Sequence, residues 1–225
     1  MSVYNRFFIG ALLIFLSLSV FSKNNTLLNE IKNNDGSKWL IEKNEGTYNF
    51  KYTNEKGEVY VNSTIITSDI EGSDLFLDKN SAGHVSLTMD YPRDIYVFEF
   101  SSGEVPRFLS ACKQITLSSV EQQQTAALLT LCSKDDEASG LILSNVDVGK
   151  LLAPDNLALK GKVKTVIGCD KSFLYDSNKK QKKNKPYLIK GDIIEIQEYN
   201  NTMLKIKYSS KSKDIVAWIK FGDIL

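Results

Sequence analysis

Three cysteines and a single histidine carry most of the chain's capacity for chemistry, because thiols, metal ligands and general bases come from these residue types. Cys112 and Cys132 lie 20 residues apart, each at one end of an apolar run. A bond between them would close a loop, and it would persist only in an oxidising compartment. The sequence therefore predicts a Cys112–Cys132 disulfide if the chain is exported.

The third cysteine, Cys169, follows the apolar residues Val166 and Ile167. Free cysteine is among the most buried residue types, so this pattern favours a small buried residue in a strand over a reactive nucleophile. The chain has no Cys-x-x-Cys pair. A zinc site with four ligands would need nearly all of the chain's three cysteines and one histidine in one place. We expect no metal and no cofactor.

His84 is the only imidazole available for a Ser-His-Asp or Cys-His arrangement. It follows an Asn-Ser-Ala-Gly turn at residues 80–83, and the chain has no Gly-x-Ser-x-Gly elbow. This context favours a surface histidine without a catalytic role. A pair of carboxylates that hydrolyses glycosides remains an alternative, because sequence spacing does not reveal which acidic residues lie close together in space.

One loop resembles the start of a calcium-binding loop. Asp78 and Asn80 stand at alternate positions before Gly83, but Ala82 and Met89 occupy positions where further oxygen ligands are needed. An ordinary turn between two strands is the prediction here. Taken with the previous points, the chain is predicted not to be an enzyme.

The first 22 residues read as a secretory signal peptide. Arg6 precedes an uncharged apolar run over residues 7–21, and cleavage after Ser22 would fit the small residues there. An uncleaved membrane anchor needs a longer apolar stretch. We expect a periplasmic or secreted protein, with no stable membrane insertion after cleavage.

Charge divides the remaining chain into two parts. The whole chain has 28 basic and 27 acidic residues, yet residues 23–160 hold 13 basic and 20 acidic ones, whereas residues 161–225 hold 14 and 7. Pro154 marks a joint between these parts. The sequence predicts an acidic domain over residues 23–155 and a basic domain over residues 162–225.

The acidic part shows short alternating segments typical of strands. Residues 47–52 and 58–62 form a hairpin pattern, and further segments follow at intervals of roughly ten residues. Residues 24–38 could hold one short helix, and residues 119–131 suit a helix or a strand. We expect an antiparallel β domain with sandwich or propeller-like sheets.

The basic part alternates in the same way, and its motifs point to a family. Tyr187-Leu188 precedes Lys190-Gly191-Asp192 and an alternating strand, and Trp218 stands in the last strand. This pattern resembles the bacterial SH3-like (SH3b) domain, although Ala217 replaces the usual glycine. The resemblance covers about 60 residues. The expected fold is mainly β, with the N-terminal antiparallel domain followed by a small SH3-like β-barrel, whose inward positions are Ile194, Ile196, Leu204, Ile206 and Trp218.

The resemblance implies binding through aromatic side chains on one face. The candidates are Tyr175, Tyr187, Tyr199 and Trp218, and Trp218 fits the barrel core as well as a groove. Residues 179–185 hold five lysines, including Lys180, Lys182 and Lys183. They form either a solvated loop or a contact for an anionic partner; export argues against nucleic acid.

The resulting functional hypothesis is a non-enzymatic exported binding protein of the bacterial cell envelope, with a peptide, cell-wall or protein ligand. One alternative is a periplasmic immunity or inhibitor protein that blocks the active site of a cell-wall-degrading toxin enzyme. Another is an envelope hydrolase with an SH3-like targeting domain, for which the acidic part offers neither a Cys-His pair nor metal ligands.

Overall fold

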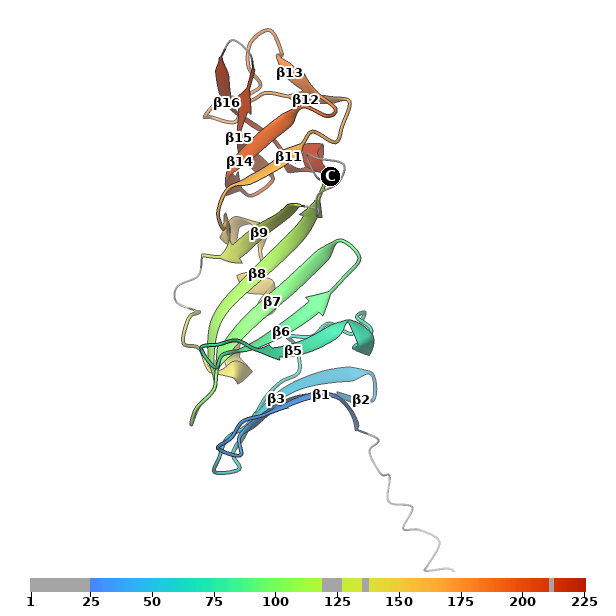
Figure 1. Cartoon of the computed structure of the whole chain (residues 1–225), viewed down its shortest axis with the longest axis vertical. Helices are drawn as coiled ribbons and strands as arrows, with labels where there is room; N and C mark the ends of the chain where they lie inside the picture. The colour runs from blue at the N-terminus through green and yellow to red at the C-terminus, as the bar shows by residue number, and fades with distance from the viewer. Residues whose placement is uncertain (1–24, 119–126, 135–137, 211–212) are drawn as a thin grey trace, which may run out of the picture.

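The structure is a computed structural model that describes residues 25–118, 127–134, 138–210 and 213–225 (Figure 1). The predicted signal peptide, residues 1–22, lies outside these ranges. The described chain consists mainly of antiparallel β-sheets, as the sequence predicts. No helix in these ranges is long and apolar enough to span a membrane.

The first sheet has four strands in chain order, built from successive hairpins. In β3 the side chains of Tyr48, Phe50 and Tyr52 are buried and alternate with partly exposed polar residues, as expected for a strand with one face on a core. The strands are β1 (Thr26–Lys32), β2 (Lys38–Asn44), β3 (Thr47–Thr53) and β4 (Val59–Asn62).

The helix expected within residues 24–38 is wrong, because β1 occupies residues 26–32 and pairs with β2. The turn between them is fixed by the Asp35 carboxylate, which accepts hydrogen bonds from the Ser37 amide and hydroxyl. A helix of this length would gain little from its own hydrogen bonds, whereas the hairpin places β1 against a strand with a buried face.

The second sheet has six strands, in the order β10-β9-β8-β7-β6-β5. It packs on the first sheet, with the rings of Trp39 and Phe100 5.5 Å apart and those of Phe50 and Phe100 5.3 Å apart. These stacked sheets correspond to a sandwich. The strands are β5 (Leu75–Lys79), β6 (Val85–Asp90), β7 (Asp94–Ser101), β8 (Arg107–Leu117), β9 (Ala127–Ser133) and β10 (Leu157–Leu159).

Two of the local predictions concern residues of this sheet. Residues 80–84 form the predicted hairpin turn between β5 and β6, in which the Asn80 side chain accepts hydrogen bonds from the amides of Ala82 and His84. For residues 119–131 the sequence left a helix and a strand open. Residues 127–131 belong to strand β9, and residues 119–126 lie outside the described ranges.

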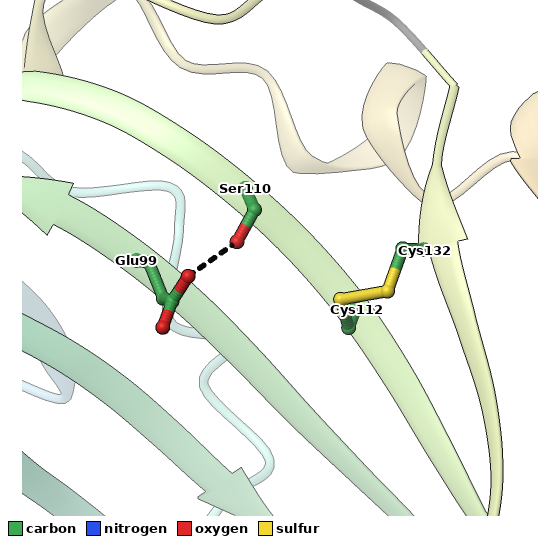
Figure 2. Close-up of a disulfide and its surroundings, with 4 residues drawn as sticks. All are labelled: Glu99, Ser110, Cys112 and Cys132. Carbon is green, nitrogen blue, oxygen red and sulfur yellow. Dashed lines mark hydrogen bonds between the residues drawn. A yellow bond between two sulfur atoms is a disulfide. The ribbon is translucent and has the colours of Figure 1, made fainter. Parts of the chain in front are cut away.

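The disulfide Cys112–Cys132 is confirmed. The two residues stand opposite each other in the β8–β9 register, with their Cα atoms 4.0 Å apart (Figure 2). On the same strand, Ser110 donates a hydrogen bond of 2.9 Å to Glu99 of β7. The disulfide thus links β9 to β8, the long central strand of the sheet.

A crossing segment closes the sandwich beyond β9 and is anchored by Asn62. This side chain is 3% exposed and donates to the carbonyls of Leu143 and Val146, which are themselves buried in the core. The segment contains η2 (Leu143–Asn145), α1 (Val148–Leu151) and η3 (Pro154–Asn156) before it continues into β10.

The basic part folds into a four-stranded sheet in the order β11-β14-β15-β16 and a separate pair of strands, β12 and β13. The described strands form no closed barrel, contrary to expectation, because β12 pairs only with β13. The positions predicted to face inward are nevertheless buried, Trp218 among them at 8% exposure. The elements are β11 (Val163–Val166), β12 (Lys171–Phe173), β13 (Tyr187–Ile189), β14 (Ile193–Asn200), β15 (Met203–Ser209), β16 (Asp214–Lys220) and η4 (Phe221–Ile224).

The two parts share a second apolar core. The far end of β8 buries Ile115 and Leu117 against the basic part, in a cluster that includes Ile167 and Ile194. The Thr165 hydroxyl donates to the carbonyl of Ser118 across the same boundary. Strand β8 therefore contributes to both cores, which lie one above the other along the molecule (Figure 1).

Candidate functional site

The aromatic residues predicted to form one binding face lie at three separate places. Tyr175 and Trp218 are together: the Tyr175 amide donates to the Trp218 carbonyl at 2.8 Å, and the reverse bond is 3.0 Å. Both line a cavity of about 240 Å³ with Lys182, and the Lys179 ammonium lies 5.1 Å from the centre of the Trp218 ring. This pocket is small for an extended ligand.

Tyr187 lies on the outer face of the β12–β13 pair and is 47% exposed. Its ring contacts Phe173 edge-on at 6.1 Å between centroids, and the Lys171 ammonium lies 5.1 Å from its centre. It does not line the cavity of Tyr175 and Trp218.

Tyr199 is largely buried at the boundary between the two parts, where its ring packs edge-on against Phe221 at 6.0 Å. Desolvation by burial raises the pKa of its hydroxyl, followed by smaller effects of nearby charges. It therefore belongs to a different cavity, described below.

The lysine-rich loop over residues 174–186 has a fixed backbone. The Asp176 carboxylate accepts hydrogen bonds of 2.9 Å from the amides of Asn178 and Lys180. Lys179, Asn184 and Lys185 adopt positive φ angles of 58°, 65° and 46°. Conformations that are costly for such residues persist only where surrounding contacts hold them. The candidates Lys180 and Lys183 are exposed on this loop, and Lys182 is half-buried.

Two larger cavities lie elsewhere: the first is lined by the sandwich and the crossing segment, and the second lies between the sandwich and the basic part. One is about 650 Å³ and the other about 700 Å³, and both are lined by Lys113 and Leu152. Since two lining residues are common to both, we treat them as one groove, called the junction groove. It runs from the β6–β7 turn past the crossing segment to the β14–β15 turn and η4.

The first half of the junction groove combines aromatic and charged side chains. The rings of Tyr91 and Tyr96 meet edge-on at 5.6 Å. Lys113 lies 2.8 Å from the Asp94 carboxylate, and its ammonium is 5.4 Å from the centre of the Tyr96 ring. Burial raises the pKa of Tyr91, and the Thr67 hydroxyl, which hydrogen-bonds to it, opposes that shift.

Lys113 is held in its charged form. Its partial burial acts to lower the pKa, but the hydrogen bond to Asp94 and the negative charges around it outweigh that effect, so the pKa is raised above 10.5. The groove therefore presents a fixed ion pair beside aromatic faces, which suits the recognition of polar groups attached to apolar ones.

The second half of the junction groove is more apolar. Ile115, Leu131 and Leu157 of the sheet lie on one side, and Tyr199 and Phe221 lie on the other. Lys220 and Asp223 supply charge at this end, although the Asp223 carboxylate already accepts a 2.7 Å hydrogen bond from Ser172.

The remaining chemistry-bearing residues stay outside this groove. Cys169 is a free, half-buried thiol in a bend rather than in the predicted strand, because the chain leaves the sheet after Val166 to reach η4. Burial raises its pKa, and the charge of Asp223 adds to that effect, so the thiolate is disfavoured. Within the described ranges, no three His, Cys, Asp or Glu residues are grouped to hold a metal ion.

Sequence reasoning found Tyr199 but missed the rest of the junction groove. Its lining comes from segments around residues 91, 113, 152 and 221, which are far apart in the chain and carry no shared motif. Compared with protein-family models, with curated proteins and with solved structures, the chain matches none.

Proposed function

We propose that the chain is a non-enzymatic exported binding protein of the bacterial cell envelope, and that it holds a peptide ligand in the junction groove. The observation that carries the proposal is the groove itself, whose two halves of about 650 and 700 Å³ meet at Lys113 and Leu152. Each half has the size of a small-molecule site, so together they suit an extended ligand.

The lining favours a peptide among the envelope ligands. Tyr91, Tyr96 and Phe221 offer aromatic faces, while the Lys113–Asp94 pair offers charges of both signs. A peptide stem alternates apolar side chains with amides, amines and carboxylates, so it would use both kinds of surface.

Binding is favoured over hydrolysis by the state of two of the three carboxylates that line the groove, Asp69 being the third. Asp94 is paired with Lys113, and Asp223 accepts from Ser172. A general acid has to be protonated and aimed at its substrate, and these two groups are instead engaged as acceptors.

The SH3-like relationship of the basic part is kept as a proposal. Its support is the order of elements: strand β11, a long excursion that contains β12 and β13, three antiparallel strands, and the 3₁₀ turn η4. In this proposal the basic part forms one wall of the junction groove, rather than carrying the whole ligand site.

A titration with a defined cell-wall stem peptide tests the proposal. We expect chemical-shift changes at the amides of Tyr96, Lys113 and Tyr199, and loss of at least tenfold in affinity when an arginine blocks the groove. Gly149→Arg obstructs the first half and Thr202→Arg the second; both positions are exposed. Val59→Arg, at a 58% exposed position of the first sheet, is the matched control.

The result that would overturn the proposal is binding unaffected by both groove variants, or no binding at all. Capture from an envelope extract then separates the alternatives. A single enzyme recovered at one-to-one stoichiometry would favour the inhibitor hypothesis, whereas turnover of purified cell wall would favour the hydrolase.

A further inference from the structure

Three of the nine exposed large apolar residues of the described chain lie close together in the basic part. Tyr187, Ile189 and Ile193 are 47%, 53% and 49% exposed, and all three fall within seven residues. Exposed apolar groups scattered singly need no explanation, but a cluster of them marks an interaction surface.

The β12–β13 pair orients Tyr187 and Ile189, whereas Ile193 begins β14. Its inner face is formed by Ser172 and Leu188, which are buried. The alternation of a strand then puts the neighbours Phe173, Tyr187 and Ile189 on the outer face. A turn in which the Ile189 amide donates to the Asp192 carboxylate at 2.8 Å leads directly to Ile193.

Lysines are frequent in the same stretch of chain, and the Lys171 ammonium lies 5.1 Å from the centre of the Tyr187 ring. Residues 171–190 contain seven lysines and one acidic residue, Asp176. The Asp176 carboxylate is already used by two backbone amides of the loop. Within the described ranges, none of these lysines forms a salt bridge. Residues 170–193, which add Asp170 and Asp192 to this range, therefore carry a net charge of +4, from seven lysines and three aspartates.

We infer that the outer face of β12–β13, with the lysine-rich loop, docks on the surface of an anionic lipid bilayer. Lysines near such a surface are attracted to lipid phosphates, and tyrosine and isoleucine side chains enter the boundary between head groups and acyl chains. A soluble polyanion would use the lysines but would leave Ile189 and Ile193 exposed to water. Exposed apolar side chains next to Lys171 and close in the chain to the lysine-rich loop thus favour lipid.

The position of this face fits that role. β12 and β13 lie at the end of the molecule opposite the sheet of β1 to β4 (Figure 1). The lining of the junction groove contains no residue of β12 or β13. A protein docked in this way keeps the groove accessible. The inference does not depend on the proposed ligand of the groove.

Flotation of the mature protein with lipid vesicles tests the inference. We expect binding to vesicles with 30% phosphatidylglycerol in phosphatidylcholine, weakened by salt, and little binding to pure phosphatidylcholine vesicles. Lys180→Glu with Lys183→Glu should weaken binding at least tenfold, and Ile189→Ser with Ile193→Ser should weaken it several-fold. All four positions are exposed, so circular dichroism should show an unchanged fold.

Lys79→Glu with Lys134→Glu is the matched control, since it makes the same change in net charge at exposed positions of the acidic part. It should bind vesicles like the unaltered chain. Equal binding to both kinds of vesicle, or no binding, would overturn the inference. So would a lysine variant that binds normally. Loss with the lysine variant but none with the isoleucine variant would overturn the part assigned to the apolar side chains, because charge alone would then account for the binding to vesicles.

Discussion

The ammonium group of Lys113 lies 2.8 Å from the carboxylate of Asp94, on adjacent strands in the wall of the junction groove. This pair opposes the effect of partial burial, which alone would lower the pKa of the Lys113 side chain. The pair also fixes a donor that lines both halves of the groove and an acceptor that lines the first half.

Asp94→Asn should lower the pKa of Lys113 relative to the unaltered protein, because desolvation then acts with less opposition. The measurement is an NMR titration of ¹³C-methylated lysines. Lys207, whose raised pKa comes first from its hydrogen bond to Asp214, should be unchanged and serves as the internal control. An unchanged Lys113 would contradict the assigned cause.

The same shift has a consequence for stability. A lysine whose pKa is higher in the folded state stabilises that state fully at pH values below 10.5, its ordinary pKa, and this contribution is lost as the pH rises through the folded value. The difference in stability between the unaltered protein and Asp94→Asn should therefore shrink above pH 10.5, as measured by urea unfolding.

Replacing both members of the disulfide, Cys112→Ala with Cys132→Ala, should reduce the free energy of unfolding by roughly 3 kcal/mol, the chain-entropy value for a loop of this length. Urea unfolding measures the loss. Cys169→Ala keeps the disulfide and should change stability far less. The unaltered chain should show one free thiol under denaturing conditions; three would mean that the bond is not formed.

Asn62→Ala should reduce the free energy of unfolding by about 3 kcal/mol, because a buried side chain with four hydrogen bonds to the backbone is lost. Asn62 donates to the carbonyls of Leu143 and Val146. It also accepts from the amides of Thr64 and Ile65. Chemical denaturation of purified protein gives this number. Asn34→Ala, at an exposed turn position, should change stability by less than about 0.5 kcal/mol. If both substitutions reduced stability equally, the assignment of Asn62 as the anchor of the crossing segment would be wrong.

Asp176→Ala should loosen the lysine-rich loop, because the amides of Asn178 and Lys180 lose their shared acceptor. We expect limited trypsin digestion after the loop lysines to become several-fold faster, with the melting temperature little changed. Asp170→Ala, an exposed acid just before β12, is the control. Cleavage at the same rate in all three proteins would show that the loop is held by other contacts.

Patterns with a short range in the chain were read correctly from the sequence. The hairpin over residues 47–62 follows from alternation and a turn, and the cysteine pair follows from spacing and compartment. The sequence wrongly predicts a helix over residues 26–32, because their pairing with β2 depends on a core that local periodicity does not reveal.

The candidate site was harder to predict because it depends on which segments meet. Tyr175 and Trp218 come together through a backbone bridge, but Tyr187 and Tyr199 face other directions. Whether a tyrosine faces a groove or a core depends on tertiary packing, and the lining of the junction groove was invisible for the same reason.

Strand β8 belongs to both apolar cores, with Phe108 and Ala111 in one and Ile115 and Leu117 in the other. Two regions with charges of −7 and +7 would suggest independent units, but a single strand cannot detach from one core without disturbing the other. Heat should therefore melt the whole chain in one cooperative transition, and calorimetry should return equal calorimetric and van't Hoff enthalpies.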